Sequence, residues 1–235
     1  MMPIMLRMMM GAGDDGGARP GAARAPSEWI MQGTEGYREE AAALVPRYEA
    51  LVFADVHREV IHLFPAPPAR VLDVGAGTGR DAAALARAGH RVTAVEPTPA
   101  FREAGQRLHP GLGLTWLDDG LPELARVPEP EGGFDLILLT AVFMHLDAAS
   151  RAVAMARLAR LVAPAGLITM ALRHGPVPSG RRMFDVSAAE TGALADKCGL
   201  RLVHDSRRED MRGRDDVTWT FVALAGPRWE APPRR

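Results

Sequence analysis

Three glycines at alternate positions, Gly75, Gly77 and Gly79, directly follow the mainly apolar run 71–74. A helical pattern begins at Asp81, so a strand, a tight turn and a helix follow one another with almost no connecting residues. Glycine suits such a turn because it adopts φ values that a Cβ forbids and lets a ligand press against bare backbone. Unpaired N–H groups at the start of the helix lie beside the turn. The pattern therefore indicates a loop that binds a ligand.

A second predicted strand, 91–96, ends in Glu96, at about the distance of twenty residues where a nucleotide-binding β-α-β unit carries its ribose-binding acid. The glycine spacing is G-x-G-x-G, whereas the dinucleotide fingerprint is G-x-G-x-x-G, and Arg80 at its third position would crowd the helix against the strand. Asp73, just before the turn, would repel a pyrophosphate but suits a cation. These features indicate S-adenosylmethionine (SAM), which carries a sulfonium and an adenosine but no phosphate.

On these residues the chain resembles the class I SAM-dependent methyltransferases that act on small molecules, over residues 69–226. The resemblance implies in-line transfer of the methyl group of SAM to an oxygen, nitrogen or carbon nucleophile, with S-adenosylhomocysteine as product. In similar proteins an acid after the third strand accepts a hydrogen bond from the adenine amino group, and Asp118 is preferred for this role over Asp119. The cofactor-binding residues implied are Asp73, Gly75, Ala76, Gly77, Thr78, Gly79, Glu96, Pro97, Asp118, Asp119 and Thr140.

Two histidines follow predicted strands at the ligand end of the sheet, His145 after the fourth and His174 after the fifth. Histidine titrates in the range that suits a general base, so both are catalytic candidates. His145 fits equally a residue that stacks near adenine or packs in the core. Arg173 is a candidate clamp for an anionic group of the substrate. Tyr37 and Tyr48 are candidates to close the substrate pocket, with helix packing as the alternative.

Strands alternate with helices along most of the chain, which predicts an α/β fold with a doubly wound, mostly parallel sheet and helices on both faces. Only a loop joins the last two of the seven strands, so the C-terminal strand should run antiparallel. The predicted strands are 70–75, 91–96, 112–117, 134–140, 166–172, 200–205 and 217–224. The predicted helices are 80–88, 98–108, 121–126, 147–162 and 187–198.

Four parts are expected along the chain: a disordered tail 1–26, an N-terminal helical cap 27–68, the SAM-binding domain 69–226 and a tail 227–235. Order should begin near Trp29. Within the cap, Pro46 is expected to separate two helices, because proline removes a backbone donor and clashes in a helix interior. No apolar stretch approaches the roughly 18 residues that a membrane span needs, and the N-terminus lacks the pattern of a signal peptide.

The net charge of −1 gives no reason to expect binding to nucleic acid or to an anionic membrane. The Asn/Asp-Pro-Pro-aromatic motif of DNA aminomethyltransferases is absent after the fourth strand, which argues against base amino groups as acceptors. The single Cys198 excludes an internal disulfide, so a cytoplasmic location fits. No cluster of histidines and acids has metal-ligand spacing, so no metal is expected. Two rival functions stay open: a non-catalytic SAM-binding or regulatory module, and an NAD-dependent oxidoreductase. The sequence carries no signal for the oligomeric state.

Overall fold

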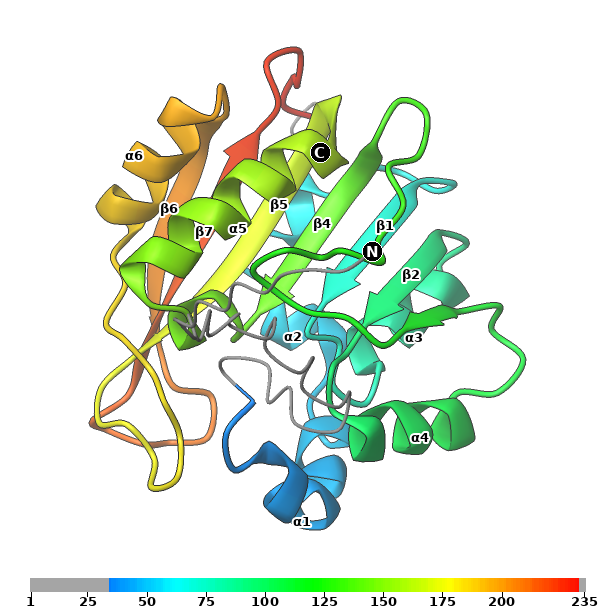
Figure 1. Ribbon diagram of the computed structural model, residues 1–235, viewed down its shortest axis with the longest axis vertical. Coiled ribbons are helices and arrows are strands. Elements are labelled where there is room, and N and C mark those ends of the chain that lie inside the picture. The colour runs from blue at the N-terminus through cyan, green and yellow to red at the C-terminus, as the bar shows by residue number, and fades with distance from the viewer. Residues whose placement is uncertain (1–33, 233–235) are drawn as a thin grey trace, which may run out of the picture.

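The computed structural model describes residues 34–232 (Figure 1). The tail 1–26 and the start of order near Trp29 lie outside the described residues. The strands are β1 (Arg70–Val74), β2 (Arg91–Val95), β3 (Thr115–Leu117), β4 (Phe134–Thr140), β5 (Val162–His174), β6 (Arg201–Glu209) and β7 (Thr218–Ala225). The α-helices are α1 (Tyr37–Glu49), α2 (Phe53–Val56), α3 (Arg80–Arg87), α4 (Pro99–Leu108), α5 (Ala148–Leu161) and α6 (Ala188–Lys197). Two 3₁₀ turns complete the list, η2 (Ile61–Leu63) and η3 (Phe143–His145).

All seven strands form one sheet in the order β3-β2-β1-β4-β5-β7-β6 (Figure 1). The strands β1 to β5 pair in parallel, whereas β7 runs antiparallel to both β5 and β6. This arrangement confirms the predicted fold class, including the antiparallel C-terminal strand. The strand order reverses between β1 and β4, and ligands bind at such a switch point in open α/β sheets.

Side-chain alternation along the strands divides the core into two layers. On one face, Leu72, Ile137 and Leu172 pack with residues of α5 such as Met155. On the other face, Val71, Leu136 and Leu138 pack with residues of α3. Figure 1 shows α5 and α6 in front of the sheet, with α1 and α4 beyond the tips of the parallel strands. The carboxyl ends of the parallel strands therefore face α1.

The N-terminal segment departs from the predicted pair of helices. Pro46 does not separate two helices, because α1 continues through it to Glu49. Pro46 lies near the C-terminal end of α1. Because proline has no backbone N–H, the helix loses one hydrogen bond, and this loss falls in its last turns. Beyond α1, Phe53 and Phe64 pack against the sheet layer that holds α3, and α2 and η2 replace the second helix expected after Pro46. Tertiary packing overrides the helical periodicity there.

The predicted helix 121–126 is a loop. The carboxylate of Asp119 accepts hydrogen bonds from the N–H groups of Gly120 (2.9 Å) and Arg126 (2.6 Å), which closes the segment into a turn. Leu124 has a φ of 45°, a left-handed conformation that a right-handed helix does not contain. The third strand is also shorter than predicted and the fifth is longer.

The first residues of the predicted C-terminal tail lie against the domain. The N–H of Arg228 donates to the carbonyl of Pro164 (2.8 Å), and Trp229 packs against the core layer that holds α3. Among the helices of residues 34–232, none combines the length and the apolar character needed to cross a membrane.

Candidate functional site

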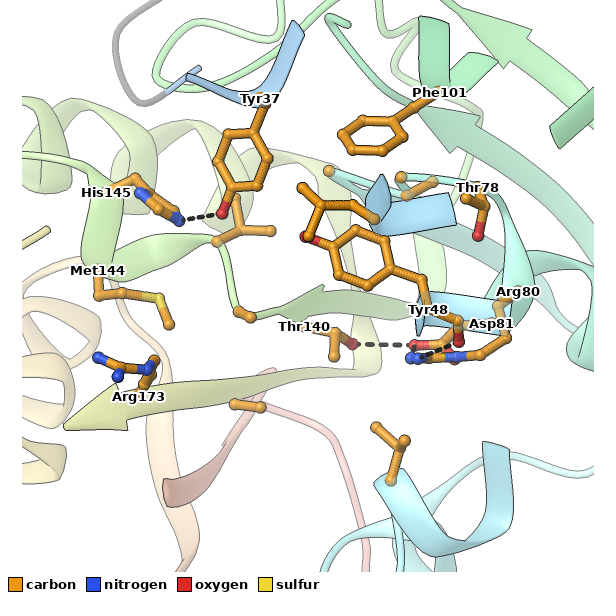
Figure 2. Close-up of a pocket in the computed structure, with 18 of the residues that line it drawn as sticks. Tyr37, Tyr48, Thr78, Arg80, Asp81, Phe101, Thr140, Met144, His145 and Arg173 are labelled. Atoms are coloured by element: carbon orange, nitrogen blue, oxygen red, sulfur yellow. Dashed lines mark hydrogen bonds and ion pairs between the residues drawn. The ribbon is translucent and has the colours of Figure 1, made fainter. Parts of the chain in front are cut away.

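A cavity of about 440 Å³ opens at the carboxyl ends of the parallel strands, under α1 (Figure 2). This volume lies in the range of small-molecule sites. Its wall includes Gly75, Ala76, Gly77, Thr78, Pro97 and Thr140 among the predicted cofactor residues, together with Asp73 and Glu96. Tyr37, Tyr48, His145 and Arg173 also line it. The structure therefore brings most of the predicted site residues together at the switch point of the sheet.

The glycine loop has the backbone conformation that its spacing predicts. Gly75, Gly77 and Gly79 have φ values of 67°, 57° and 76°, in the left-handed region. A Cβ added at Gly75 would lie 2.5 Å from a methyl carbon of Val142. Gly79 stands directly before α3 as its N-cap residue and does not itself line the cavity. The loop needs glycine both for its turns and for its close approach to the chain after β4.

Glu96 ties the end of β2 to this loop. Its carboxylate accepts hydrogen bonds from the N–H of Gly77 (2.9 Å) and from the N–H of Thr98 (2.7 Å). The side chain is buried, and burial raises the pKa of Glu96, against the effect of these backbone donors. Each carboxylate oxygen retains a lone pair, so Glu96 can still accept hydrogen bonds from hydroxyl groups in the cavity.

Asp73 carries a carboxylate oxygen without a partner. The residue is 2% exposed, and its Oδ2 has no hydrogen-bond partner among the described residues. Burial, with the neighbouring carboxylate of Asp81, raises the pKa of Asp73 to about 8. An unpaired buried carboxyl group is costly. Its position in the cavity wall therefore marks a site for a hydrogen-bond donor or a cation.

Asp81, at the start of α3, joins this helix to the end of α2 and to β4 in a network that the sequence did not predict. Its carboxylate contacts Nε2 of His57 (2.9 Å) and accepts from Nε of Arg80 (2.7 Å) and the hydroxyl of Thr140 (3.2 Å) (Figure 2). Burial by itself would raise the pKa of Asp81, but His57 and Arg80 together hold it below its ordinary value. No spacing in the sequence relates His57 to Asp81, so nothing in the sequence indicated this contact.

The predicted adenine acids do not line the cavity. Asp118 is about half exposed and pairs with Arg102 (2.8 Å) and Arg126 (3.7 Å). Asp119 is buried in its own turn, where it accepts the backbone bonds already described. Backbone from the same loop reaches the cavity at Gly120. The segment therefore offers the cavity main-chain groups in place of a carboxylate.

His145 and Tyr37 form a hydrogen-bonded pair in the cavity wall (Figure 2). Nδ1 of His145 donates to the carbonyl of Arg182 (2.8 Å), so Nε2 of the neutral ring accepts from the Tyr37 hydroxyl (3.0 Å). Burial lowers the pKa of His145, which favours the neutral ring at pH 7. Burial also raises the pKa of Tyr37, so the phenol keeps its proton.

His174 does not line the cavity, although Arg173 beside it does. Successive residues of a strand point to opposite faces, so only one of the two can face the cavity. The ring of His174 is fixed between Asp185 (2.5 Å from Nδ1) and the hydroxyl of Thr220 (2.8 Å from Nε2). The ring of His174 therefore lies outside the cavity that holds the other candidates.

Tyr48 contributes an aromatic wall. Its ring lies 5.7 Å from that of Phe101 on α4, and Tyr37 lies 6.1 Å from the same ring, between centroids. Burial raises the pKa of Tyr48. Both tyrosines thus pack α1 against α4 and also close the cavity. Among residues 34–232, no group of three or more histidines, cysteines and acids is placed to hold a metal ion.

Comparisons with known proteins agree with this arrangement. Residues 71–166 match the sequence model of a family described as "Methyltransferase domain". A protein of Oceanobacillus iheyensis named an uncharacterized methyltransferase is 29% identical over 143 residues, which cover 60% of this chain and 61% of the relative. A Mycobacterium bovis protein named in the same way is 32% identical over 131 residues, which cover 52% of this chain and 64% of the relative. The chain thus spans less than two thirds of the length of these curated relatives.

One similar solved structure is the 1,6-didemethyltoxoflavin-N1-methyltransferase of Burkholderia thailandensis, with bound 1,6-didemethyltoxoflavin and S-adenosylhomocysteine. It has a TM-score of 0.55 and 23% identity, and the match covers 80% of this chain and 90% of that one. This likeness concerns the fold. Residues 71–166 thus resemble a methyltransferase domain in sequence, and the sheet that carries them has a fold shared with a solved methyltransferase.

Proposed function

We propose that the protein transfers the methyl group of SAM to an oxygen, nitrogen or carbon nucleophile of a small molecule. The observation that carries the proposal is the buried, unpartnered carboxylate oxygen of Asp73 beside the glycine loop of a methyltransferase domain. Such a carboxylate attracts a cation and repels a pyrophosphate. The same site is therefore poorly suited to a dinucleotide.

The residues present fit SAM. Glu96 would accept hydrogen bonds from its ribose hydroxyls, Asp73 would face its ammonium group, and the loop 75–78 would lie against it with bare backbone. When bound, SAM supplies a methyl group on a sulfonium, which is already an activated leaving group and needs no metal. In place of the predicted acid at Asp118, main-chain groups near Gly120 would meet the adenine.

The chain's own contribution is to position the acceptor and to hold its proton. Tyr37, Tyr48 and Phe101 cover the cavity with aromatic rings, which limits the access of water. Holding a nucleophile in line with its target can supply a large part of a rate enhancement. An acceptor hydroxyl or amine can donate its hydrogen bond to the Tyr37 oxygen. The acceptor proton then moves to Tyr37 as the Tyr37 proton moves to Nε2 of His145.

The substrate class is inferred from the cavity and from one relative of the fold. A cavity of about 440 Å³ suits a small molecule. The Burkholderia thailandensis structure contains bound 1,6-didemethyltoxoflavin, a small molecule. Both observations support a small-molecule acceptor.

Calorimetric titration of the full chain with SAM, S-adenosylhomocysteine and NAD tests the cofactor. We expect the first two to bind and NAD not to bind. Glu96→Gln should weaken SAM binding, and Glu103→Gln, an exposed glutamate on α4, should leave it unchanged. Preferential binding of NAD would replace the proposal with an oxidoreductase. Transfer of labelled methyl from SAM to the small molecules of a cell extract tests turnover, and binding without any transfer would indicate a regulatory module.

A further inference from the structure

A row of three side chains crosses the C-terminal half of the sheet at the edge of the cavity. Arg173 on β5 is paired with Trp219 on β7, and Trp219 is paired with Arg208 on β6. Residues paired across neighbouring strands point to the same face of a sheet. All three line the cavity, so two guanidinium groups flank one indole on its floor. Phe221, also in the lining, is 2% exposed, and the guanidinium of Arg208 lies over its ring, 4.6 Å from the centroid.

Arg173 is a buried cation without a matching anion. The residue is 9% exposed, its Nε has no hydrogen-bond partner, and its Nη1 makes only a long bond of 3.4 Å to the carbonyl of Gly175. Among residues 34–232 no carboxylate lies within ion-pair distance of it. Burial, with the nearby Arg214, lowers the pKa of Arg173, against the opposing effect of the more distant carboxylates of Asp210 and Asp216. A buried charge that lacks a partner is unfavourable, so this guanidinium should gain from an anion in the cavity.

Three other cations of this region are already compensated or fixed. Arg214 bonds to both oxygens of Asp210 (2.9 and 2.8 Å), and Arg181 bonds to Glu40 (2.8 Å). Arg208 is held by the carbonyl of Asp55 (2.7 Å), although its Nε is also buried without a partner. Arg173 is therefore the cation of this row that is left for a ligand, with a second orphan N–H at Arg208 behind Trp219.

The two ends of the cavity also differ in charge. Asp73, Asp81 and Glu96 line the end at β1 and β2, where Arg80 pairs with Asp81, whereas Arg173 and Arg208 line the end at β5 and β6, where Asp210 pairs with Arg214. Figure 2 shows Arg173 near Met144 and His145, away from Thr78, Arg80 and Asp81. A cationic ligand on the acidic end leaves the basic end for a different, anionic molecule.

We propose that the methyl acceptor is a small organic anion, whose carboxylate or phosphate group binds Arg173 while its carbon skeleton lies against Trp219. This inference rests on the proposed function, because it names the substrate class of the same cavity. Arginine presents two parallel N–H donors that match the oxygens of either group. The nucleophilic atom of the acceptor would then lie toward Tyr37 and His145. Its proton can therefore still pass to Tyr37, as in the proposed function.

Binding of model anions to the full chain tests this inference without any turnover. Benzoate and phenyl phosphate are titrated by calorimetry with and without saturating S-adenosylhomocysteine, and benzamide serves as the neutral analogue. The variants are Arg173→Gln, which removes the charge, and Arg173→Lys, which keeps it. Arg207→Gln is the matched control, since Arg207 is exposed, neighbours Arg208 on β6 and points to the opposite face. Thermal melts establish that each variant is folded.

We expect one of the two anions to bind the wild type and Arg207→Gln alike, and benzamide to bind more weakly. Arg173→Gln should lose about tenfold or more in anion affinity, the scale of a hydrogen bond to a charged group, and Arg173→Lys should retain part of it. The anion with the larger loss identifies carboxylate or phosphate. The affinity for S-adenosylhomocysteine should stay the same in all variants.

Four results would overturn the inference. The first three are that neither anion binds the wild type, that Arg173→Gln binds them as the control does, and that benzamide binds as well as benzoate. A tenfold loss of S-adenosylhomocysteine affinity in Arg173→Gln would also overturn it, because Arg173 would then hold the carboxylate of the cofactor. Failure of the wild type to bind SAM or S-adenosylhomocysteine is a separate result, which refutes the proposed function. The anion titrations would still measure whether Arg173 binds an anion.

Discussion

Asp73→Asn should stabilise the free protein and weaken its binding of SAM. Asp73 is 2% exposed, has one oxygen without a partner and lies beside a second buried carboxylate, that of Asp81. Asparagine has nearly the same shape but no charge, so it removes the unfavourable ionisation while filling the same space. Opposite effects on stability and binding are typical of a residue that is kept for function.

The magnitude follows from the pKa of Asp73, which is raised from 3.8 to about 8. For an acid whose folded pKa is raised, the contribution to stability is present below the unfolded pKa and is lost as pH rises through the folded pKa. Each pH unit in that window costs about 1.4 kcal/mol for one proton. At pH 7 the wild type should therefore have lost on the order of 2–4 kcal/mol that Asp73→Asn keeps.

Urea unfolding of both proteins between pH 4 and pH 8 measures this difference. The free energy of unfolding of Asp73→Asn minus that of the wild type should be near zero at pH 4 and should grow until about pH 8. Asp196→Asn, at an exposed position on α6, is the matched control and should show no such growth. A constant difference across this range would refute the reasoning, since Asp73 would then not be an unpaired buried acid.

The second half of the prediction concerns the ligand. At pH 8, SAM should bind Asp73→Asn about tenfold more weakly than the wild type, the scale of one charge-assisted hydrogen bond. The affinity of the wild type should rise with pH toward 8, because the ionised carboxylate is the form that attracts a cation. Equal SAM affinity of the two proteins would mean that Asp73 has a structural role only.

Four further results are expected. Glu96→Ala should weaken SAM binding by roughly 1.5–3 kcal/mol in calorimetry, and an unchanged affinity would remove Glu96 from the site. His145→Ala should bind SAM but lose about 10²–10⁴-fold in turnover, whereas His174→Ala should keep full turnover because its ring lies outside the cavity; equal rates in both would leave catalysis to proximity alone. Turnover should survive EDTA, and a loss restored by a divalent ion would contradict this. Deletion of residues 1–26 should leave the melting temperature nearly unchanged, and a fall of several degrees would show that this segment docks on the domain.

Local sequence patterns predicted much of the fold. The alternation of apolar runs with helical periods predicted a parallel sheet, and the lack of a helix before the strand at 218–225 predicted its antiparallel direction. The sequence also predicted the loop at Gly75, Gly77 and Gly79 and the acid at Glu96, because neighbouring residues specify a turn and a strand end. The structure confirms the fold, the conformation of the glycine loop and the position of Glu96 at the end of β2, since each depends on a few contiguous positions.

Predictions that depended on long-range contacts were less successful. Pro46 did not break α1, and residues 121–126 became a loop because the Asp119 carboxylate captured two backbone donors. Asp118 faces Arg102 and Arg126 at the surface, although its place after β3 suggested the cavity. In each case a partner remote from the local pattern, or a packing surface, competed with the local preference.

The sequence by itself determined the sheet, the glycine loop and the acid at the end of β2, because these follow from backbone geometry over short spans. Only the tertiary structure decided that Arg173 and not His174 faces the cavity, and that His57 meets Asp81 across 24 positions. The phase of a strand relative to a cavity, and the pairing of distant buried charges, are set by the packing of the whole sheet against its helices.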